Sequence, residues 1–484
     1  MSGRGAEQPQ SVEKQIMTPG LDAEVIVVGG GISGLTCAWN LQQRGLRVLV
    51  LESRAKAGGS IGTTRENGCL LEAGPNSALD TTPLIGQLLD QLGIAPERIA
   101  ANPAARNRYV LRDGRLIALP LAPWEFVASP LFSTRAKLRL LGEAFIRPGT
   151  AVDESVAAFV RRRLGDEFLD YAIDPFVAGV YAGDPEALSV KAAFPRLYEL
   201  EQAHGSLIRG YLAGDAARKR NPEKSKHAAP MFAFRDGMQT LTDAIARKLA
   251  RVELATAAVK VVPGAECQIV TARSAGGLRE YRARGVVLAA PAYAAARLVA
   301  PFAAAAGAAL AAIEYPPVAV AISAYRCDAV RHALDGFGVL VPQRERRSVL
   351  GTIFSSSLFA HRAPPDLALL TTFVGGMRQP DFAQRDDSAI STLVQAEHAA
   401  MLGTPARAEF IRIRRWERAI PQYTLGHLDR ISAIEAAERQ FRGVFFCANY
   451  RGGVAIGDCV KAAHGMGSRV EEFLRGGPGH DPSI

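Results

Sequence analysis

The sequence predicts an α/β fold that several separate segments of the chain build together. Residues 24–52 run through a strand, a glycine turn, a helix, a second strand and a carboxylate. Residues 230–293 return to strands around a helix, and residues 443–474 repeat the order strand, glycine turn, helix. Because strands that alternate with helices indicate a parallel sheet, we expect these three segments to meet in one discontinuous domain.

The first segment carries the pattern G-x-G-x-x-G at Gly29, Gly31 and Gly34. The first glycine permits a tight turn, the second lets the backbone approach a pyrophosphate, and the third lets the helix pack closely on the sheet. Glu52 ends the second strand, about 20 residues further on, where a carboxylate accepts the hydroxyls of an adenosine ribose. Any tight strand-to-helix turn would need glycines, but the strand, helix and acid together predict a Rossmann-like domain for an adenine dinucleotide.

Composition excludes several classes of protein. The chain has 484 residues, 48% hydrophobic and 22% charged, which is ordinary for globular proteins and suggests two or three domains. A net charge of +9 suits an anionic small molecule or an acidic membrane surface, whereas no basic-aromatic module favours nucleic acid. The six cysteines form no C-x-x-C pair, so we expect no metal site and no disulfide framework. That pattern fits the reducing cytoplasm.

Neither end of the chain nor its most apolar stretch predicts a membrane span. Residues 1–21 are polar, so we expect a disordered tail and no secretory signal peptide. The longest apolar stretch, 286–313, contains Pro291, Arg297 and Pro301. A transmembrane helix needs about 20 uninterrupted apolar residues. We therefore expect a strand and packed helix there.

The remaining segments predict a second domain and an insertion. Residues 100–120 predict a basic hairpin that turns at Asp113-Gly114. Four later stretches are strand-like and predict a mixed β-sheet: 315–327, 337–342, 349–354 and 367–374. We assign residues 22–90, 230–293 and 430–476 to the dinucleotide-binding domain, residues 91–120 and 294–429 to a mixed-sheet substrate domain, and residues 121–229 to a helical insertion.

The insertion has two distinctive parts. Residues 121–149 place Trp124 and Phe132 beside Arg135 and Lys137, a mixture that suits an interfacial membrane patch. A helical cap over a substrate cavity explains the same pattern, and the two interpretations are compatible. Residues 214–229 are charged and without periodicity, which predicts a surface loop.

Further glycine turns resemble the flavin-binding elements of amine-oxidase-like flavoproteins. One is Gly58-Gly59, and another is Gly74-Pro75-Asn76; their spacing from Glu52 favours FAD over NAD. Gly452-Gly453 precedes the last helix, whose first amides could meet a flavin pyrimidine or a pyrophosphate. Each alone would be an ordinary turn.

Narrower motifs then make most of the chain, from about residue 24 to 475, resemble the oxygen-dependent protoporphyrinogen oxidase family in its bacterial and plant form. The motifs include LEAGPNS, DPFVAGVYAGDPEALSVKAAFPRLYELEQAHGSLI, LGTIFSSSLFAHRAPP, TTFVGG and AIPQYTLGH. The glycine motif is shared by many flavoproteins, whereas residues 174–207 and the SSSLF-x-x-RAPP run are much more specific.

The resemblance implies an FAD-dependent six-electron oxidation of protoporphyrinogen IX to protoporphyrin IX in haem biosynthesis. Molecular oxygen would be the acceptor and give hydrogen peroxide. Hand-over of product to a ferrochelatase and a homodimer are left open. The mixture at 121–149, with no signal peptide or membrane span, predicts a peripheral position on the cytoplasmic face of a membrane. The alternatives are a coproporphyrinogen III oxidase, an amine or carotenoid oxidoreductase, and a non-catalytic FAD-bound scaffold that hands on porphyrin.

The resemblance also implies the site residues. Arg108 would pair with a substrate propionate, for which a guanidinium is suited, and Leu340, Ile353 and Phe373 would sandwich the macrocycle. Ile353 stands where leucine is common. The implied FAD-binding residues are Gly29, Gly30, Gly31, Ile32, Ser33, Gly34, Glu52, Ser53, Ser60, Gly74, Pro75, Asn76, Ser77, Val259, Trp416, Val454, Ala455 and Ile456. Ser60 departs from the large side chain frequent in relatives. No catalytic base is assigned among the eight histidines.

Overall fold

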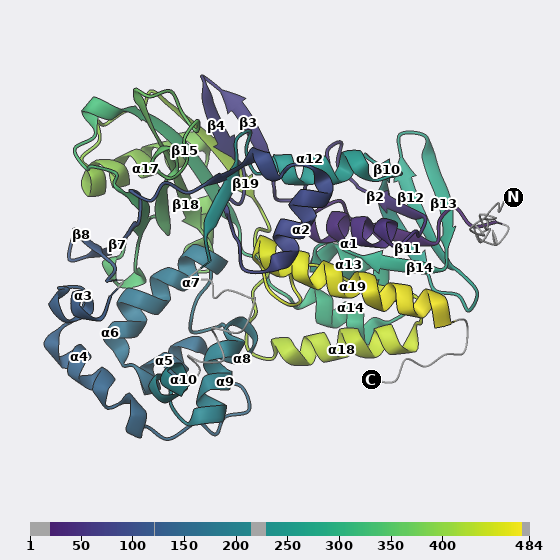
Figure 1. Ribbon diagram of the computed structural model, residues 1–484, viewed down its shortest axis with the longest axis horizontal. Helices are drawn as coiled ribbons and strands as arrows, with labels where there is room; N and C mark the ends of the chain where they lie inside the picture. The colour runs from purple at the N-terminus through teal and green to yellow at the C-terminus, as the bar shows by residue number, and fades with distance from the viewer. Residues whose placement is uncertain (1–19, 121, 214–228, 477–484) are drawn as a thin grey trace, which may run out of the picture.

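The computed structural model describes residues 20–120, 122–213 and 229–476. The expected disordered tail and the expected surface loop therefore fall almost entirely outside the described residues. Figure 1 shows two lobes: a layered α/β lobe that contains the first and the last of the described residues, and a second lobe in which a large sheet stands above a group of helices.

A five-stranded parallel sheet forms the centre of the first lobe, with strand order β10-β2-β1-β14-β20. Its strands are β1 Val25–Val28, β2 Val48–Leu51, β10 Val252–Glu253, β14 Gly285–Leu288 and β20 Val444–Phe446. Strands β1, β2, β14 and β20 are buried along their whole length, as hydrophobic runs of parallel strands are. All three predicted segments contribute, so the predicted discontinuous sheet is confirmed.

The prediction that all strands within residues 230–293 belong to this parallel sheet is wrong for four of those strands. Strand β9 pairs with β5 and β6, and strands β11, β12 and β13 form an antiparallel sheet of their own. The bounds are β5 Ala78–Leu79, β6 Arg98–Ala100, β9 Met231–Phe234, β11 Ala257–Val262, β12 Gln268–Ser274 and β13 Gly277–Ala283. One face of the antiparallel sheet packs on the core and the other meets water, which antiparallel sheets tolerate.

Both faces of the parallel sheet are covered. One face packs against α1 Ile32–Gln43, α2 Pro83–Leu92, α12 Gln239–Lys248 and α19 Ile456–Gly476. The other packs against the antiparallel sheet and α13 Ala292–Val299, α14 Ala304–Ala311 and α18 His427–Gln440. Helices α13 and α14 thus share a core with the parallel sheet, although the predicted boundary placed 294–313 in the substrate domain. Within the part of the chain that the structure describes, no helix has the length and apolar character to cross a membrane.

A seven-stranded mixed sheet forms the upper part of the second lobe, in the order β19-β15-β18-β17-β16-β7-β8. Its strands are β7 Asn107–Arg112, β8 Arg115–Ala118, β15 Val318–Arg326, β16 Gly336–Leu340, β17 Gly351–Phe354, β18 Leu367–Gly375 and β19 Phe410–Trp416. The predicted hairpin is confirmed, with φ of 51° at Asp113 and 74° at Gly114 in its turn. Helix α17, Asp387–Leu402, covers one face of the sheet.

The insertion is helical, as predicted. Its main helices are α3 Pro123–Ala128, α4 Thr134–Leu141, α5 Val156–Arg163, α6 Asp166–Phe168, α7 Asp174–Tyr181, α8 Val190–Ala193, α9 Pro195–His204 and α10 Leu207–Ala213, with a π-helical turn at Leu169–Ile173. Helix α7 lies between the other helices and the sheet (Figure 1). It therefore packs on the sheet face opposite to α17.

Candidate functional site

The first glycine turn leaves no room for side chains. A Cβ added to Gly34 would lie 2.0 Å from the carbonyl oxygen of Gly29, and one added to Gly29 would lie 2.9 Å from the backbone of Ala289. Gly29 also has a φ of +115°, which only glycine adopts readily. Helix α1 therefore starts directly against the carboxyl end of β1, where Ile32 and Ser33 form its first residues.

Glu52 lies beside this turn and is only 6% exposed. Its Oε2 accepts a hydrogen bond from the backbone N–H of Gly30 at 2.6 Å. Its Oε1 accepts from the N–H of Arg54 at 2.8 Å and from the Ser53 hydroxyl at 3.2 Å. An ionised carboxylate has about four acceptor sites, so Glu52 is held in place and can still accept a hydrogen bond from a bound molecule.

The two following loops close around the glycine turn. The N–H of Gly58 donates to the carbonyl of Gly30 at 2.8 Å, and a Cβ on Gly59 would lie 3.1 Å from the Cα of Gly31. Gly74 approaches the carbonyl of Ser60 so closely that a Cβ there would lie 2.1 Å away. The structure therefore brings the first glycine turn, the 58–60 loop and the 74–77 turn together.

Trp416 joins these loops from the edge strand of the other sheet. Its indole N–H donates to the carbonyl of Ala73 at 2.7 Å, and the Arg54 guanidinium lies 5.5 Å from the centre of its ring. Val259 is on β11, 41% exposed; the preceding turn is tied to the end of β2 through the Thr256 N–H and the Glu52 carbonyl, 2.8 Å apart.

The start of α19 is held by residues that the sequence reasoning missed. The Tyr423 hydroxyl accepts from the N–H of Gly453 at 2.9 Å and donates to the carbonyl of Asn449 at 2.7 Å. The His427 ring stacks on Tyr423 with centres 4.2 Å apart, and its Nε2 donates to the carbonyl of Tyr450 at 3.0 Å. Burial lowers the pKa of His427 to about 4, so it is neutral at pH 7. In the sequence, Tyr423 and His427 belong to the motif AIPQYTLGH, which could have pointed to them. This cluster fixes the turn before Val454, Ala455 and Ile456.

The four predicted substrate residues share one face of the seven-stranded sheet. Leu340 of β16 pairs with Gly351, which pairs in turn with Phe373. In the neighbouring row, Gly338 pairs with both Arg108 and Ile353. Directly paired residues point to the same face, and residues two apart in a strand do so as well. Arg108, Leu340, Ile353 and Phe373 therefore lie on the face opposite to α17.

Arg108 is half-buried on this face. Its Cζ lies 5.8 Å from the centre of the Phe337 ring, and its side chain has no hydrogen bond or ion pair within the described ranges 20–120, 122–213 and 229–476. Burial lowers the pKa of Arg108, although an arginine stays charged in proteins. A desolvated guanidinium without a counter-ion is costly, so this arginine is suited to a carboxylate from outside the chain.

Asn76 connects the 74–77 turn to the same face. Its Nδ2 lies 3.2 Å from the Ser355 hydroxyl and 3.4 Å from that of Thr371, whose register partner is Ile353. Its Oδ1 is buried and finds no hydrogen-bond donor within the described part of the chain. A buried acceptor without a donor costs about 1–3 kcal/mol. The arrangement thus fits a bound molecule that donates a hydrogen bond between the turn and the sheet face.

A second missed residue, Arg362, clamps this turn. It is 1% exposed, and its Nη1 donates to Glu72 Oε1 at 2.5 Å while its Nη2 donates to the Asn76 carbonyl at 3.0 Å. The same Glu72 oxygen accepts from the N–H of Met238 at 2.9 Å. Glu72 and Arg362 belong to motifs that are visible in the sequence, LEAGPNS and RAPP, but the sequence does not show that the two motifs are in contact.

The other buried histidine lies away from this face. His398 is in α17, and its ring lies between the Tyr325 hydroxyl at 3.1 Å and the Thr372 hydroxyl at 2.7 Å. Burial lowers its pKa to about 3. Thr372 points to the α17 side of β18, so His398 stabilises the sheet from the opposite side.

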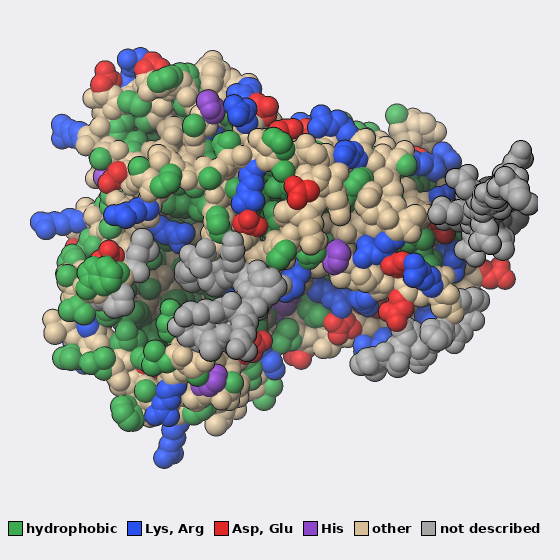
Figure 2. Space-filling view, viewed as in Figure 1, with side chains coloured by type: hydrophobic (Ala, Val, Ile, Leu, Met, Phe, Trp, Pro, Cys, Tyr) green, Lys and Arg blue, Asp and Glu red, His purple; other side chains and the backbone are tan. Residues whose placement is uncertain are grey.

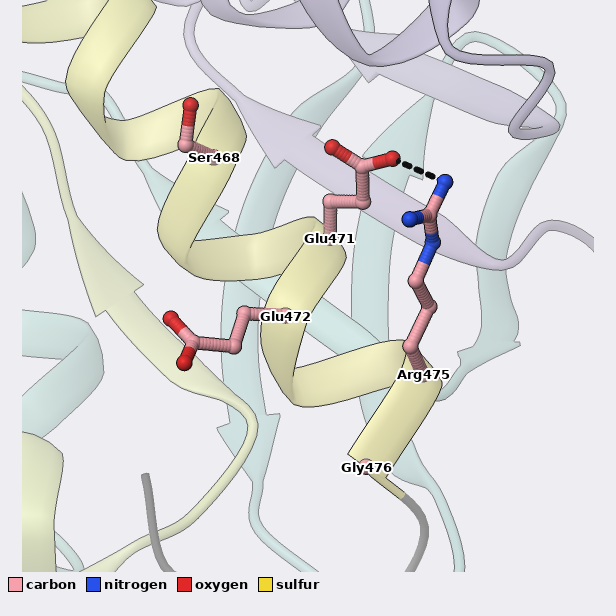
Figure 3. Close-up of a pocket in the computed structure, with 5 residues that line it drawn as sticks. All are labelled: Ser468, Glu471, Glu472, Arg475 and Gly476. Atoms are coloured by element: carbon pink, nitrogen blue, oxygen red, sulfur yellow. Dashed lines mark ion pairs between the residues drawn. The ribbon is translucent and has the colours of Figure 1, made fainter. Parts of the chain in front are cut away.

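A surface hollow near the C-terminal end of α19 is separate from these residues. It has a volume of about 530 Å³ and contains Glu471 and Arg475, which form an ion pair of 2.6 Å (Figure 3). Arg44 also pairs with Glu471, at 2.9 Å. None of the predicted site residues lines this hollow.

Comparisons with known proteins identify the family of this chain. A family model described as flavin containing amine oxidoreductase matches residues 32–465. The chain belongs to this flavin-containing amine oxidoreductase family. This family membership confirms the predictions of an FAD cofactor and of an oxidoreductase.

Individual proteins show how far the similarity extends. The chloroplastic protoporphyrinogen oxidase of Nicotiana tabacum is 34% identical, over 94% of this chain and 87% of that protein. The coproporphyrinogen III oxidase of Bacillus subtilis (strain 168) is 28% identical, over 90% of this chain and 95% of that protein. Cyclohexylamine oxidase from Brevibacterium oxydans IH-35A superimposes with a TM-score of 0.65 at 17% identity, over 94% of this chain and 100% of that chain, a likeness of fold alone.

Proposed function

We propose that this flavoprotein oxidises protoporphyrinogen IX to protoporphyrin IX. The similarity to chloroplastic protoporphyrinogen oxidases supports the substrate class. One structural observation carries the proposal: Arg108, a half-buried arginine without an acidic partner among the described residues, shares a sheet face with Leu340, Ile353 and Phe373. An apolar macrocycle with carboxylate side chains needs such a combination.

The chain's own residues would position the substrate. Arg108 would bind one propionate through charge-assisted hydrogen bonds, and the three apolar side chains would pack against the macrocycle and exclude water. Asn76 stands between this face and the predicted flavin loops, with its Oδ1 available to a donor. Bound FAD would supply the hydride acceptor, with molecular oxygen as the final acceptor.

The predicted FAD-binding residues would divide the cofactor between them. The amides at the start of α1, from Gly31 to Gly34, would meet the pyrophosphate, since a helix N-terminus favours an anion. Glu52 would accept the ribose hydroxyls. The start of α19, held by Tyr423, would present a further amide at Val454, whereas the Ala455 N–H donates to Asp458 Oδ2 at 3.3 Å.

We also propose that the insertion attaches to a membrane surface. Part of it reverses the usual distribution of side chains: Arg163 and Glu143 are 0% exposed and paired at 3.1 Å, whereas Trp124 is 73% and Phe145 83% exposed. Phe132, which was predicted to belong to this patch, is instead buried. Figure 2 shows hydrophobic side chains gathered over this lobe together with projecting basic ones. Exposed apolar residues beside basic ones favour an interface with anionic lipid.

The experiment that tests the function is a turnover assay with protoporphyrinogen IX and coproporphyrinogen III, followed by porphyrin fluorescence and peroxide release. We expect faster conversion of protoporphyrinogen, because Arg108 supplies one charge for a dicarboxylate whereas a tetracarboxylate would need more. A preference for coproporphyrinogen would replace the proposed substrate. Bound porphyrin without peroxide would instead indicate the non-catalytic scaffold.

A further inference from the structure

A buried ion pair joins the first residue of α7 to the segment that follows β18. The Asp174 and Arg378 side chains are 6% and 5% exposed. Arg378 Nη2 donates to Asp174 Oδ1 and, at 2.7 Å, to its main-chain carbonyl, while Nη1 donates to the Val341 carbonyl at 3.1 Å. Asp174 Oδ2 accepts from the N–H of Gln343 at 2.8 Å. The pair therefore fixes the start of α7 against the ends of β16 and β18.

Helix α7 lies directly on the sheet face that carries the predicted substrate residues. Ala178 and Ala182 share a core with Val320 of that face. A Cβ added to Gly179 would lie 2.9 Å from the Leu340 side chain. A larger residue at position 179 would displace the Leu340 side chain, so the place of Leu340 depends on the place of α7.

The far end of α7 reaches the other half of the candidate site. The Tyr181 carbonyl accepts from the Gln422 side chain at 2.8 Å, and the Tyr181 ring lies 5.9 Å from that of Tyr423. Tyr423 holds the Gly453 N–H at the start of α19. Helix α7 therefore spans from the predicted substrate residues to the predicted cofactor turn.

Stability alone is a poor explanation for this ion pair. Burial raises the pKa of Asp174 and lowers that of Arg378, the direction in which desolvation penalises both charges. Replacing a buried pair by apolar residues is frequently neutral or stabilising. What the charges provide here is a fixed geometry, because four hydrogen bonds define where α7 begins.

We propose that Asp174 and Arg378 are positioning residues that fix α7 over the porphyrinogen-binding face and so shape the site for the macrocycle. The inference rests on the proposed function. It concerns the geometry of the apolar wall and assigns neither residue a chemical step.

The test compares variants of this pair with a matched buried arginine. Arg378→Met, Arg378→Lys and Asp174→Asn are purified with flavin bound. Arg163→Met is the control, because Arg163 is equally buried in the same insertion but pairs with Glu143 and Glu201, away from the sheet face. KM and kcat for protoporphyrinogen, flavin content, the thermal midpoint and hydrogen exchange across residues 174–181 are measured.

We expect Arg378→Met to raise KM about tenfold or more, the equivalent of one lost hydrogen bond, with flavin content unchanged and faster exchange in 174–181. Arg378→Lys, which keeps the charge, should recover part of the effect. The control should lower the thermal midpoint and leave KM unchanged.

Equal changes of KM in Arg378→Met and Arg163→Met, or faster exchange with an unchanged KM, would overturn the inference. If Arg378→Met does not fold, Arg378→Lys and Asp174→Asn decide in the same way. If the wild type oxidises no porphyrinogen, the proposed function fails separately. In that case, unchanged hydrogen exchange across residues 174–181 in the flavin-bound variants would show that Asp174 and Arg378 do not position α7.

Discussion

Arg108 is the residue on which the proposed substrate site depends most directly. We expect Arg108→Ala to raise KM for protoporphyrinogen by a factor that corresponds to about 1.5–3 kcal/mol, because a charge-assisted hydrogen bond to a propionate is lost. Flavin content should not change, since Arg108 lies on the sheet and away from the glycine turns. Steady-state kinetics and the flavin absorbance of the purified variant measure both effects.

The neighbouring Arg106 provides the control for this substitution. It is exposed, lies two residues away, and its removal changes the net charge by the same amount. Arg106→Ala should leave KM unchanged. If the two variants had the same KM, Arg108 would not be a substrate ligand.

Glu52 gives a corresponding test of the cofactor site. Glu52→Ala should weaken FAD retention, because it removes both the predicted ribose acceptor and the hydrogen bond that holds the Gly30 N–H. The loss of hydrogen bonds to a charged group corresponds to about 1.5–3 kcal/mol. The ratio of flavin to protein absorbance after gel filtration measures it. Glu24→Ala is the control, since Glu24 directly precedes β1, at the end of the strand away from the glycine turn. Equal flavin loss in the two variants would contradict the role of Glu52.

Residue roles of this kind could be predicted only where a motif carried them. The glycine turn and Glu52 follow from local chemistry, and the structure brings them together. Arg362 lies in the specific SSSLF-x-x-RAPP run, but its role could not be found in that way, because its partner Glu72 is 290 positions away. Contacts between distant loops depend on how the sheets pack, which the sequence does not state.

Among the secondary-structure elements, the start of α19 depends on a neutral histidine. The folded pKa of His427, about 4, lies below its ordinary value of 6.5, so the unfolded chain binds more protons between these values. The stabilising contribution is therefore complete above pH 6.5 and is lost as the pH falls towards 4. At pH 5 the loss is about 2 kcal/mol.

We expect this loss to appear when denaturant unfolding is compared at pH 7 and pH 5. His427→Gln cannot titrate, so it should be less stable than the wild type at pH 7 but lose less stability on acidification. His398 has a still lower pKa and contributes in the same direction, so the difference between the two proteins isolates His427. An identical loss in both would contradict the assignment.

The strands show which structural features can be predicted from the local sequence. Hydrophobic runs predicted most strands of both large sheets, because burial on one or both faces leaves its pattern in each strand. Strand β19 was not predicted, because three arginines interrupt its apolar residues. The pairing partners of the strands were harder to predict. Met231–Phe234 was assigned to the parallel sheet, but it pairs with two short strands near residues 78 and 98. Pairing depends on register between distant segments, and a short apolar run fits more than one neighbour.

On the scale of the whole molecule, helix packing explains why one domain boundary was misplaced. Residues 292–311 are alanine-rich helices whose composition fits any apolar surface, and only their packing against Val286 and Leu288 assigns them to the parallel sheet. The insertion was easier to delimit, since its helical pattern interrupts two regions of strands. Its proposed membrane contact depends on side chains that face outward.

That contact can be tested with two leucines of equal exposure. Leu138 in the insertion and Leu278 on β13 are both 62% exposed. Leu138→Ser should reduce binding to anionic phospholipid vesicles at low salt, measured by co-sedimentation, by about tenfold or more, because burying a leucine in lipid contributes about 1.5–3 kcal/mol. Leu278→Ser should bind as the wild type does, since it removes the same apolar area from the opposite lobe. If the wild type remained in the supernatant, or if both variants lost binding equally, the insertion would not be the membrane-facing surface, and its exposed apolar residues would need another partner.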